Sequence, residues 1–165
     1  MLSAQPLAVL LHIAASALWI GTMVFFLVVL GPAVHELEPR LAIRILNRGR
    51  IGFEIGSWIA IATLLLSGIF NLLTQLSTGN GLPTPTYFAL LSIKLLFFSA
   101  MVVHHCLQVF KYAPAIAGLT AQLAGTSGAW PEPLLSHWRR WFLLLKINAV
   151  LGPLVVLLGM NLVRS

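Results

Sequence analysis

The sequence predicts an all-α integral membrane protein, an antiparallel four-helix bundle built from a single domain over residues 1–165. First, 59% of the residues are hydrophobic and only 8% are charged, whereas soluble domains carry about 25% charge. The mean hydropathy is +0.95. Second, the apolar residues form four blocks, each near the roughly 20 residues that cross a bilayer as a helix. The blocks cover about 7–31, 51–73, 87–110 and 141–163.

The first block is expected to be a retained helix rather than a signal peptide. Met1–Pro6 carries no basic residue, and no small-residue cleavage site follows the block. Pro6 and Pro32 bracket it, and proline is tolerated at the start of a helix or marks its end. We therefore expect this helix to end near Pro32.

The second helix is expected to follow an amphipathic turn at the membrane interface. Arg40, Arg44 and Arg48 are spaced by four residues, which places them on one helical face. The helix then carries the ridge Gly52-x-x-x-Gly56-x-x-x-Ala60, and such small residues let another helix approach closely. Ordinary helix packing is the favoured interpretation of this ridge.

The third and fourth helices are joined by a longer connection over 113–137. We expect a short helix around Ala115–Ala124 and then an irregular chain through Pro131 and Pro133. Gly152-Pro153 predicts a kink in the fourth helix. The chain lacks the common nucleotide-binding and hydrolase motifs. Cys106 is the only cysteine, so neither an intrachain disulfide nor a cysteine-based metal cluster is possible.

The distribution of basic residues predicts the orientation in the membrane. Lys and Arg gather in the first and third connections, whereas 74–86 contains none. Cytoplasmic segments carry this excess, so both termini should lie outside the inner (plasma) membrane of a bacterium. The net charge of +6 then reflects topology and lipid headgroups rather than nucleic acid. An aromatic belt is expected at the inner boundary, from Tyr112, Trp130, Trp138 and Trp141.

Ionisable side chains interrupt the apolar blocks, where each costs about 2.5–3.5 kcal/mol on insertion scales. With a rise of about 1.5 Å per residue, they fall into two layers. His12 and Lys94 lie toward the outer face, with Asn71 and Asn161 nearer the rim. The inner layer comprises Glu54, His104 or His105, Lys146 and Asn148.

Depth excludes one pairing and suggests another. His12 and His104 differ in depth by about 18 Å, too far for two axial ligands of one haem iron. Glu54 and Lys146 lie at matched depth and are expected to pair, because buried charges are normally paired.

Angular position predicts an internal column of polar and polarisable groups. Helical periodicity places Lys94, Met101 and His105 on one face of the third helix. On the first helix, His12, Ser16, Trp19 and Met23 form one stripe. Trp19, Met23 and Met101 taken alone are best explained as core residues. Which of His104 and His105 faces the interior is left open.

Three short motifs resemble the HemJ and CopD-like membrane proteins. They are Leu11-His12-x6-Trp19-Ile20-Gly21, Leu64-Leu65-Leu66-Ser67-Gly68, and Tyr87-x5-Ile93-Lys94-Leu95 followed by His104-His105. The resemblance to HemJ implies haem b and protoporphyrinogen oxidation, with His12 and Lys94 matching the histidine of the first helix and the lysine of the third. The sequence departs from that family where Asn148 is followed by Ala149 instead of Glu.

The CopD branch implies copper uptake or resistance. Gly31-Pro32-Ala33 and the lead-in Leu82–Tyr87 resemble this branch more closely. Thioether, imidazole and thiol ligands select Cu(I). The chain offers them singly, without a Met-x-x-Met repeat, at Met23, Met101, Met160, Cys106 and the histidines.

The leading functional expectation is a haem-b-binding membrane redox protein, active in porphyrinogen oxidation or electron transfer. His12 would bind the haem iron, Lys94 would be the sixth ligand or a propionate contact, and Trp19 would lie at the cofactor. The alternatives are a CopD-like copper transport or resistance protein and a non-catalytic accessory subunit docking through Gly52 and Gly56. A membrane partner or homo-oligomer is possible. Secondary site candidates are Met101, His104, His105, Glu54 and Lys146.

The one-sided Lys and Arg bias yields a testable topology. A membrane-impermeant thiol reagent should label Gly79→Cys from outside, while Gly128→Cys should be labelled only after the membrane is opened. Labelling of Gly128→Cys from the outside alone would reverse the orientation.

Overall fold

The computed structural model describes residues 4–77, 84–122 and 130–162, and no strand occurs among them. Four helical spans are long and apolar enough to cross a membrane, which confirms the predicted all-α four-helix architecture in a lipid bilayer. The first span comprises α1 (Ala4–Phe25), η1 (Phe26–Leu30) and α2 (Gly31–His35); the second is α3 (Pro39–Ser77); the third comprises α4 (Pro85–Cys106), η2 (Leu107–Tyr112) and α5 (Ala113–Gln122); the fourth is α6 (Glu132–Leu162).

The helices extend well beyond the predicted apolar blocks at one end of the bundle. The arginine-bearing segment is the first part of α3, and the short helix expected near 115–124 is α5, continuous with α4. The expectation of irregular chain through Pro133 is wrong, because α6 begins at Glu132. Proline in the first helical turn lacks only an N–H that would have no partner there. Gly79 and Gly128 lie outside the described residues.

Two π-helical segments explain why prolines do not end their helices. Proline removes one helical hydrogen bond, and its ring collides with the carbonyl four residues earlier. Each segment ends two residues before a proline, η1 before Pro32 and η2 before Pro114. At the end of each segment the backbone bond spans five residues, from Gly31 N–H to the Phe26 carbonyl and from Ala113 N–H to the Gln108 carbonyl. The first span therefore continues through Pro32 and ends at His35, three residues beyond the proline expected to mark its end.

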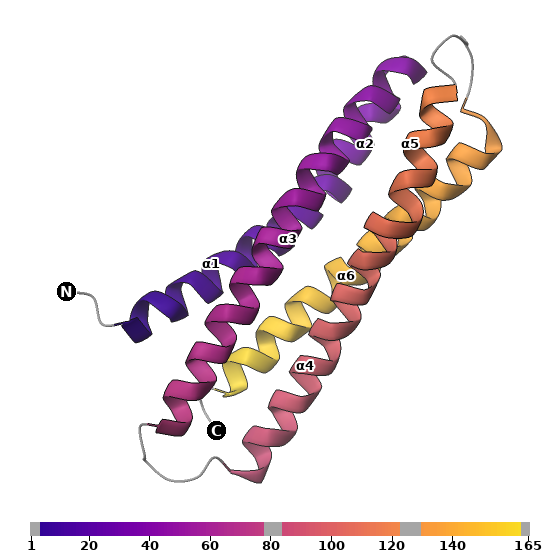
Figure 1. The fold of residues 1–165 in the computed structure, drawn as a ribbon. Coiled ribbons are helices and arrows are strands. Elements are labelled where there is room, and N and C mark those ends of the chain that lie inside the picture. The colour runs from indigo at the N-terminus through magenta and orange to yellow at the C-terminus, as the bar shows by residue number, and fades with distance from the viewer. Residues whose placement is uncertain (1–3, 78–83, 123–129, 163–165) are drawn as a thin grey trace.

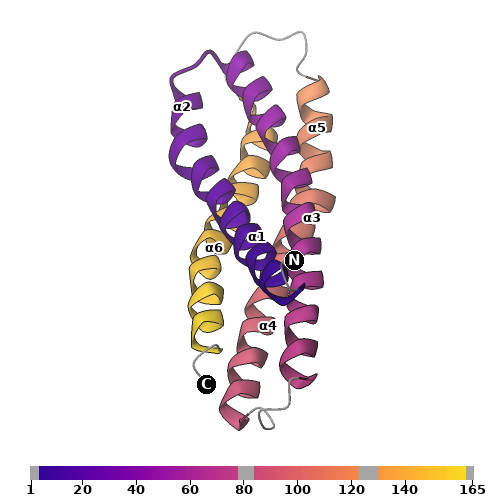
Figure 2. The ribbon, with the colours of Figure 1, turned by 90° about the vertical axis from the view of Figure 1, so that its left-hand side faces the viewer.

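The bundle consists of two helix pairs. α1 packs chiefly on α3, α4 packs chiefly on α6, and α1 also contacts α6 (Figures 1 and 2). Successive spans run in opposite directions, so the α1 and α6 ends that lead to the chain termini point toward the end where α3 meets α4 (Figure 1). We call this the outer end, following the predicted orientation, and the opposite one the inner end.

The two pairs meet closely at Gly152 of α6. A Cβ atom at this position would lie 2.8 Å from Ile20 Cγ1 of α1 and 3.7 Å from Met101 Cε of α4. Only glycine therefore permits this approach. α3 also packs closely on the first span at Gly49, where a Cβ would lie 2.8 Å from the movable end of Leu30 and 3.3 Å from Phe26 Cε2.

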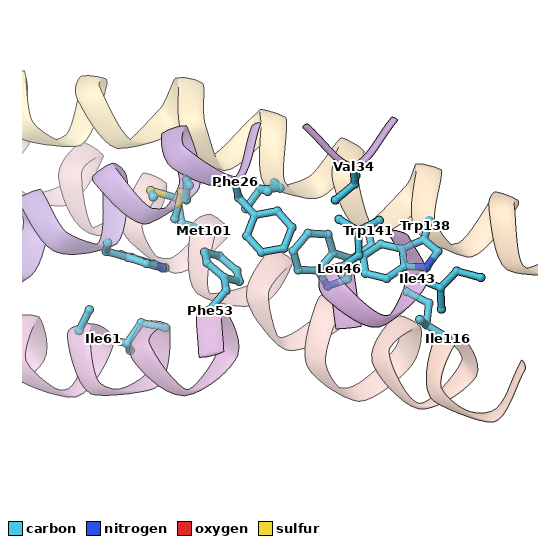
Figure 3. Packing of buried hydrophobic residues seen from close by; sticks show 14 of the residues in the cluster. Phe26, Val34, Ile43, Leu46, Phe53, Ile61, Met101, Ile116, Trp138 and Trp141 are labelled. Atoms are coloured by element: carbon cyan, nitrogen blue, oxygen red, sulfur yellow. The ribbon is translucent and has the colours of Figure 1, made fainter. Parts of the chain in front are cut away.

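The inner half contains a large aromatic core (Figure 3). Trp141 is fully buried, and its ring lies 5.2–5.7 Å from those of Phe26, Phe53, Trp138 and Phe142. The expected aromatic belt is therefore wrong for Trp138 and Trp141. The buried positions of α6 alternate in steps of four and three, as in a coiled-coil seam: Leu134, Trp138, Trp141, Leu145, Asn148 and Gly152.

The outer half is packed more loosely. Within the described part of α4, no side chain is buried between Pro85 and Ala100. Among the described residues of α6, burial ends at Gly152. Large apolar side chains such as Leu66 and Val150 point outward, 71% and 66% exposed, as expected where lipid replaces water.

The small-residue ridge of α3 packs only in part. Ala60 is buried. At Gly52 and Gly56, a Cβ atom would have no described side chain or neighbouring helix within 4 Å. The expectation of close helix packing is therefore wrong at these two glycines. They line a shallow groove with Thr22 and Phe25.

The contact at Gly152 predicts a strong asymmetry between two glycine substitutions. Gly152→Ala should lower the melting temperature in detergent, because overpacking at a close helix crossing costs about 1–3 kcal/mol. Gly21→Ala should be neutral or stabilising, since a Cβ there meets nothing within 4 Å of the described chain. Adding Ile20→Ala to Gly152→Ala should recover part of the loss. Equal effects of the two glycine variants would argue against this crossing.

Candidate metal and cofactor site

His12 lies at the outer end, where α1 packs on α3. Its Nδ1 is 2.9 Å from Ser67 Oγ, and Ser67 Oγ donates its hydrogen to the Thr63 carbonyl at 2.6 Å. Because a hydroxyl has one hydrogen to donate and Ser67 gives it to Thr63, we assign the hydrogen between His12 and Ser67 to His12 Nδ1. The neutral ring then carries its free lone pair on Nε2.

Ser67 of α3, rather than a residue of α1, orients the His12 ring. Ser16, one turn along α1, donates its Oγ hydrogen to the backbone carbonyl of His12 itself at 2.8 Å. Besides the Ser67 hydroxyl, the backbone of Leu64 on α3 also interacts with the imidazole ring. Both residues belong to the Leu64–Gly68 motif, which was therefore the available signal.

Lys94 of α4 lies in the same layer as His12, as predicted. It is close enough to interact electrostatically with the imidazole. Two glycines leave room here: a Cβ at Gly68 would lie 3.4 Å from His12 Cε1, and one at Gly159 would lie 3.1 Å from Lys94 Nζ. All four spans therefore contribute to this outer site. Iron ligation by His12 and the two suggested roles of Lys94 remain predictions.

Trp19 and the two asparagines predicted nearer the outer rim differ in their surroundings. Trp19 is 2% exposed and packs edge-on against Phe98, with ring centroids 6.1 Å apart. Its Nε1 has no hydrogen-bond partner among the described residues. Asn161 is exposed and donates to the Leu157 carbonyl, whereas Asn71 keeps a buried carbonyl oxygen. Trp19 is thus a core residue, about two helical turns inward of His12 on α1.

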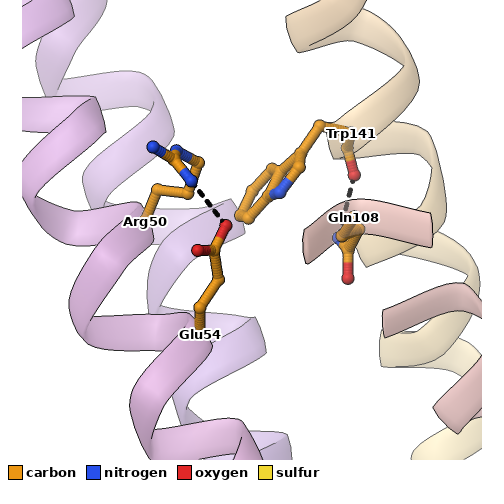
Figure 4. A network of polar contacts seen from close by, with 4 residues as sticks. All are labelled: Arg50, Glu54, Gln108 and Trp141. Atoms are coloured by element: carbon orange, nitrogen blue, oxygen red, sulfur yellow. Dashed lines mark hydrogen bonds and ion pairs between the residues drawn. The ribbon is translucent and has the colours of Figure 1, made fainter. Parts of the chain in front are cut away.

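In the inner layer, Glu54 pairs with Arg50 rather than with Lys146 (Figure 4). Arg50 Nη1 lies 2.7 Å from Glu54 Oε1, and the two side chains are 6% and 13% exposed. Lys146 is exposed, because it follows Leu145 of the buried seam and points away from the interior. The predicted Glu54–Lys146 pair is therefore wrong: matched depth does not ensure that two side chains face each other.

The adjacent histidines have different surroundings. His104 is partly buried, and its Nδ1 lies 2.8 Å from Asn148 Oδ1. Asn148 in turn donates to the Met101 carbonyl at 3.1 Å, so this chain of polar contacts links α4 to α6. His105 is 1% exposed and faces the interior.

The His105 ring is surrounded by aromatic side chains, and its nitrogens make no hydrogen bond within the described residues. Its ring centroid lies 5.1 Å from that of Trp58 and 5.8 Å from that of Phe53. Gln108 and the backbone of Glu54 lie nearby. Even so, neither ring nitrogen has a partner within hydrogen-bond geometry in the described structure.

Sequence reasoning missed two interior polar residues. Gln108 is fully buried and donates to the Trp141 carbonyl at 3.0 Å, which ties η2 to α6 (Figure 4). The missed partner of Glu54 is Arg50, one helical turn earlier on α3. The spacing of four residues was a signal for this pair.

The interior donors form no conventional metal cluster. Within the described ranges, no three His, Cys, Asp or Glu side chains gather where they could hold a metal ion. Any metal site must therefore use fewer such ligands or include methionine sulfur, which is a soft donor.

The Arg50–Glu54 pair predicts how substitutions at positions 50, 54 and 146 combine in their effect on stability. Glu54→Gln should destabilise the protein by up to about 3 kcal/mol, because it leaves the Arg50 charge buried without a counter-charge. Arg50→Met combined with Glu54→Gln should cost less than the sum of the two single changes. Lys146→Met should add independently to Glu54→Gln. Melting curves in detergent measure all of these, and coupling between positions 54 and 146 would contradict the assignment.

The chain is similar to copper resistance protein D of Pseudomonas syringae pv. tomato, with 32% identity over 107 residues. The aligned region is 64% of this chain and 34% of that protein, so the chain spans about a third of the curated relative it matches. No protein-family model and no solved structure matches the chain. The similarity supports the CopD-like side of the resemblance, and no comparison supports the HemJ side.

Proposed function

We propose that this chain handles copper in the membrane, with His12 Nε2 as the ligand that receives the ion near the outer end. The observation that carries this proposal is the hydrogen-bond chain from His12 through Ser67 to the Thr63 carbonyl. A metal ligand must present a lone pair, and this chain keeps that lone pair on Nε2. The similarity to a copper resistance protein supports copper as the ion.

Ser67 acts as a positioning residue for the imidazole. Metal-binding histidines commonly donate their other ring N–H to a fixed acceptor, which sets ring orientation and raises ligand basicity. Ser67 is 6% exposed, and its own hydrogen is engaged by α3. The ring therefore reaches the site already oriented, and little conformational entropy is lost on binding.

His12 alone is an incomplete ligand set, which suits a transported ion better than a permanently bound one. A transported ion must bind favourably enough to enter and weakly enough to leave. One imidazole beside the cation of Lys94 meets this requirement, because like charges at short range weaken binding. Lys94 would thus limit the residence of copper at the outer site.

A second candidate function is haem b binding, and the position of Lys94 is the observation that favours it. An ammonium beside His12 could contact a haem propionate, and histidine is a common axial ligand of haem iron. The loosely packed outer half leaves α4 without a buried side chain over its first 16 residues, Pro85–Ala100. Bound haem would supply one-electron redox chemistry. His12 and Lys94 would hold and orient it.

Lys94→Met separates the two functions, because it changes the two affinities in opposite directions. Copper binding at His12 should strengthen on the order of fivefold, the effect of removing about 1 kcal/mol of repulsion. Haem binding should weaken, because the propionate contact or sixth ligand is lost. The measurements are copper content and affinity of the purified protein, and its absorption spectrum with and without added haem.

Variants of the histidine and its support complete this experiment. His12→Gln should remove the outer copper site, and Ser67→Ala should weaken it by about 10–100-fold. His137→Gln and Ser92→Ala are matched controls, since the half-buried His137 hydrogen-bonds to Pro133 and the exposed Ser92 to Phe88, each within its own helix. A Soret band that is lost in His12→Gln would show that the cofactor at His12 is haem and not copper. Binding of neither would leave the accessory-subunit function.

A further inference from the structure

Three soft donor side chains are buried at the centre of the bundle. Met23 of α1 and Met101 and His105 of α4 are 0%, 2% and 1% exposed. Met101 and His105 are separated by one helical turn on the same face of α4. Thioether sulfur and imidazole nitrogen are the ligands that bind Cu(I) well.

These donors lie at similar depths along the bundle. Ile20 and Met101 both meet Gly152, so they share one level. From that level Met23 is about 4.5 Å farther inward along α1, and His105 is about 6 Å farther along α4, at a rise of about 1.5 Å per residue. Met23 therefore lies between the levels of Met101 and His105.

Side chains of α1 and α4 meet in the bundle centre, although their backbones are not neighbours. Each of these helices packs chiefly on another one, α3 and α6 respectively. Nevertheless, the Trp19 ring of α1 touches the Phe98 ring of α4 edge-on. Met23 and Met101 are the next interior positions on these helices, and Met101 points into the core shared with Phe53 (Figure 3).

The unpartnered nitrogens of His105 independently support a ligand at this place. Both of its ring nitrogens are buried and have no hydrogen-bond partner among the described residues. A buried polar group without a partner costs free energy, so it needs an explanation. Ser57 Oγ of α3 is equally buried and unpartnered.

The nearby charged groups are paired with each other, and the other buried polar groups are neutral. Glu54 pairs with Arg50, and Gln108 Nε2 donates to the Trp141 carbonyl, whereas Gln108 Oε1 and Ser57 Oγ have no hydrogen-bond partner among the described residues. The groups free to bind at the centre are therefore the two sulfurs, the imidazole and two neutral oxygens, all uncharged when His105 is neutral. An uncharged donor set in a low-dielectric interior favours a monovalent over a divalent cation, because desolvation cost rises steeply with charge.

We propose that Met23, Met101 and His105 form a buried Cu(I) site at the bundle centre. This inference rests on the proposed copper function and deepens it, because it names the oxidation state and a second position for the ion. The ion arrives and leaves as Cu(I), so no electron transfer is involved. Methionine has three flexible side-chain torsions, which let the two sulfurs adjust to the ion.

The two sites lie in series along α1. His12 and Met23 are separated by 11 residues, about 16 Å along the helix axis. The outer site presents a half-buried imidazole beside a cation, and the central site presents soft donors without a charged group among the ligands. Cu(I) released from His12 would therefore find a softer ligand set farther inward.

X-ray absorption at the copper edge tests the central site in the full-length protein purified in detergent. Loaded anaerobically with Cu(I), the His12→Gln variant should still bind copper, with both sulfur and nitrogen ligands. Met23→Leu combined with Met101→Leu should remove the sulfur signal and weaken Cu(I) binding at least tenfold. Met160→Leu is the matched control, because that methionine is 55% exposed.

His105→Gln completes the series and should lower Cu(I) affinity without removing the sulfur ligands, while His137→Gln should have no effect. Circular dichroism confirms that each variant remains helical. If the spectrum of unaltered protein shows nitrogen ligands only, the central site is wrong while copper binding at His12 stands. If unaltered protein binds no copper of either oxidation state, the proposed function itself fails.

Discussion

The close approach of α1 and α6 at Gly152 is the contact on which the arrangement of the bundle depends. Each hairpin pair, α1 with α3 and α4 with α6, is held along much of its length, whereas the two pairs join mainly through α1 and α6. Helices in lipid gain little from hydrophobic burial, so close packing at small residues must supply the attraction. The Gly152–Ile20 contact therefore also sets the distance between the interior faces of α1 and α4.

The polar interior follows from that distance. His12 and Lys94 approach each other only because the four spans converge near Gly68 and Gly159. Farther inward, the aromatic core around Trp141 excludes water, and polar groups there must bond to one another. Several do not: among the described residues, both His105 ring nitrogens, Ser57 Oγ and Gln108 Oε1 are buried without a hydrogen-bond partner. One bundle thus provides two candidate sites with different chemistry. The outer site has a half-buried imidazole, and the central site has buried thioether and imidazole ligands away from water.

Depth and composition made much of this predictable. The four spans and the shared layer of His12 and Lys94 follow from apolar length and helical rise, which are local properties of the chain. The interior stripe of Met101 and His105 followed from helical periodicity. These features needed no knowledge of which helices are neighbours.

The errors have a different origin. Lys146 was paired with Glu54 because their depths match, but the angular position of each side chain depends on which helix packs where. The seam of α6 contains Leu145 and Asn148, and Lys146 falls outside it. Ser67 was likewise missed as the partner of His12, because a contact between α1 and α3 is a tertiary property.

The π-helical segments before Pro32 and Pro114 affect how this chain should be compared with others. A π turn holds one residue more than the α-helix around it, so each segment acts as a one-residue insertion that left the helix continuous. Counting faces by steps of 3.6 across Phe26–Leu30 or Leu107–Tyr112 therefore loses register, by roughly 100° per extra residue. Relatives that lack these prolines are expected to align with a one-residue gap inside a helix, where alignments normally forbid one.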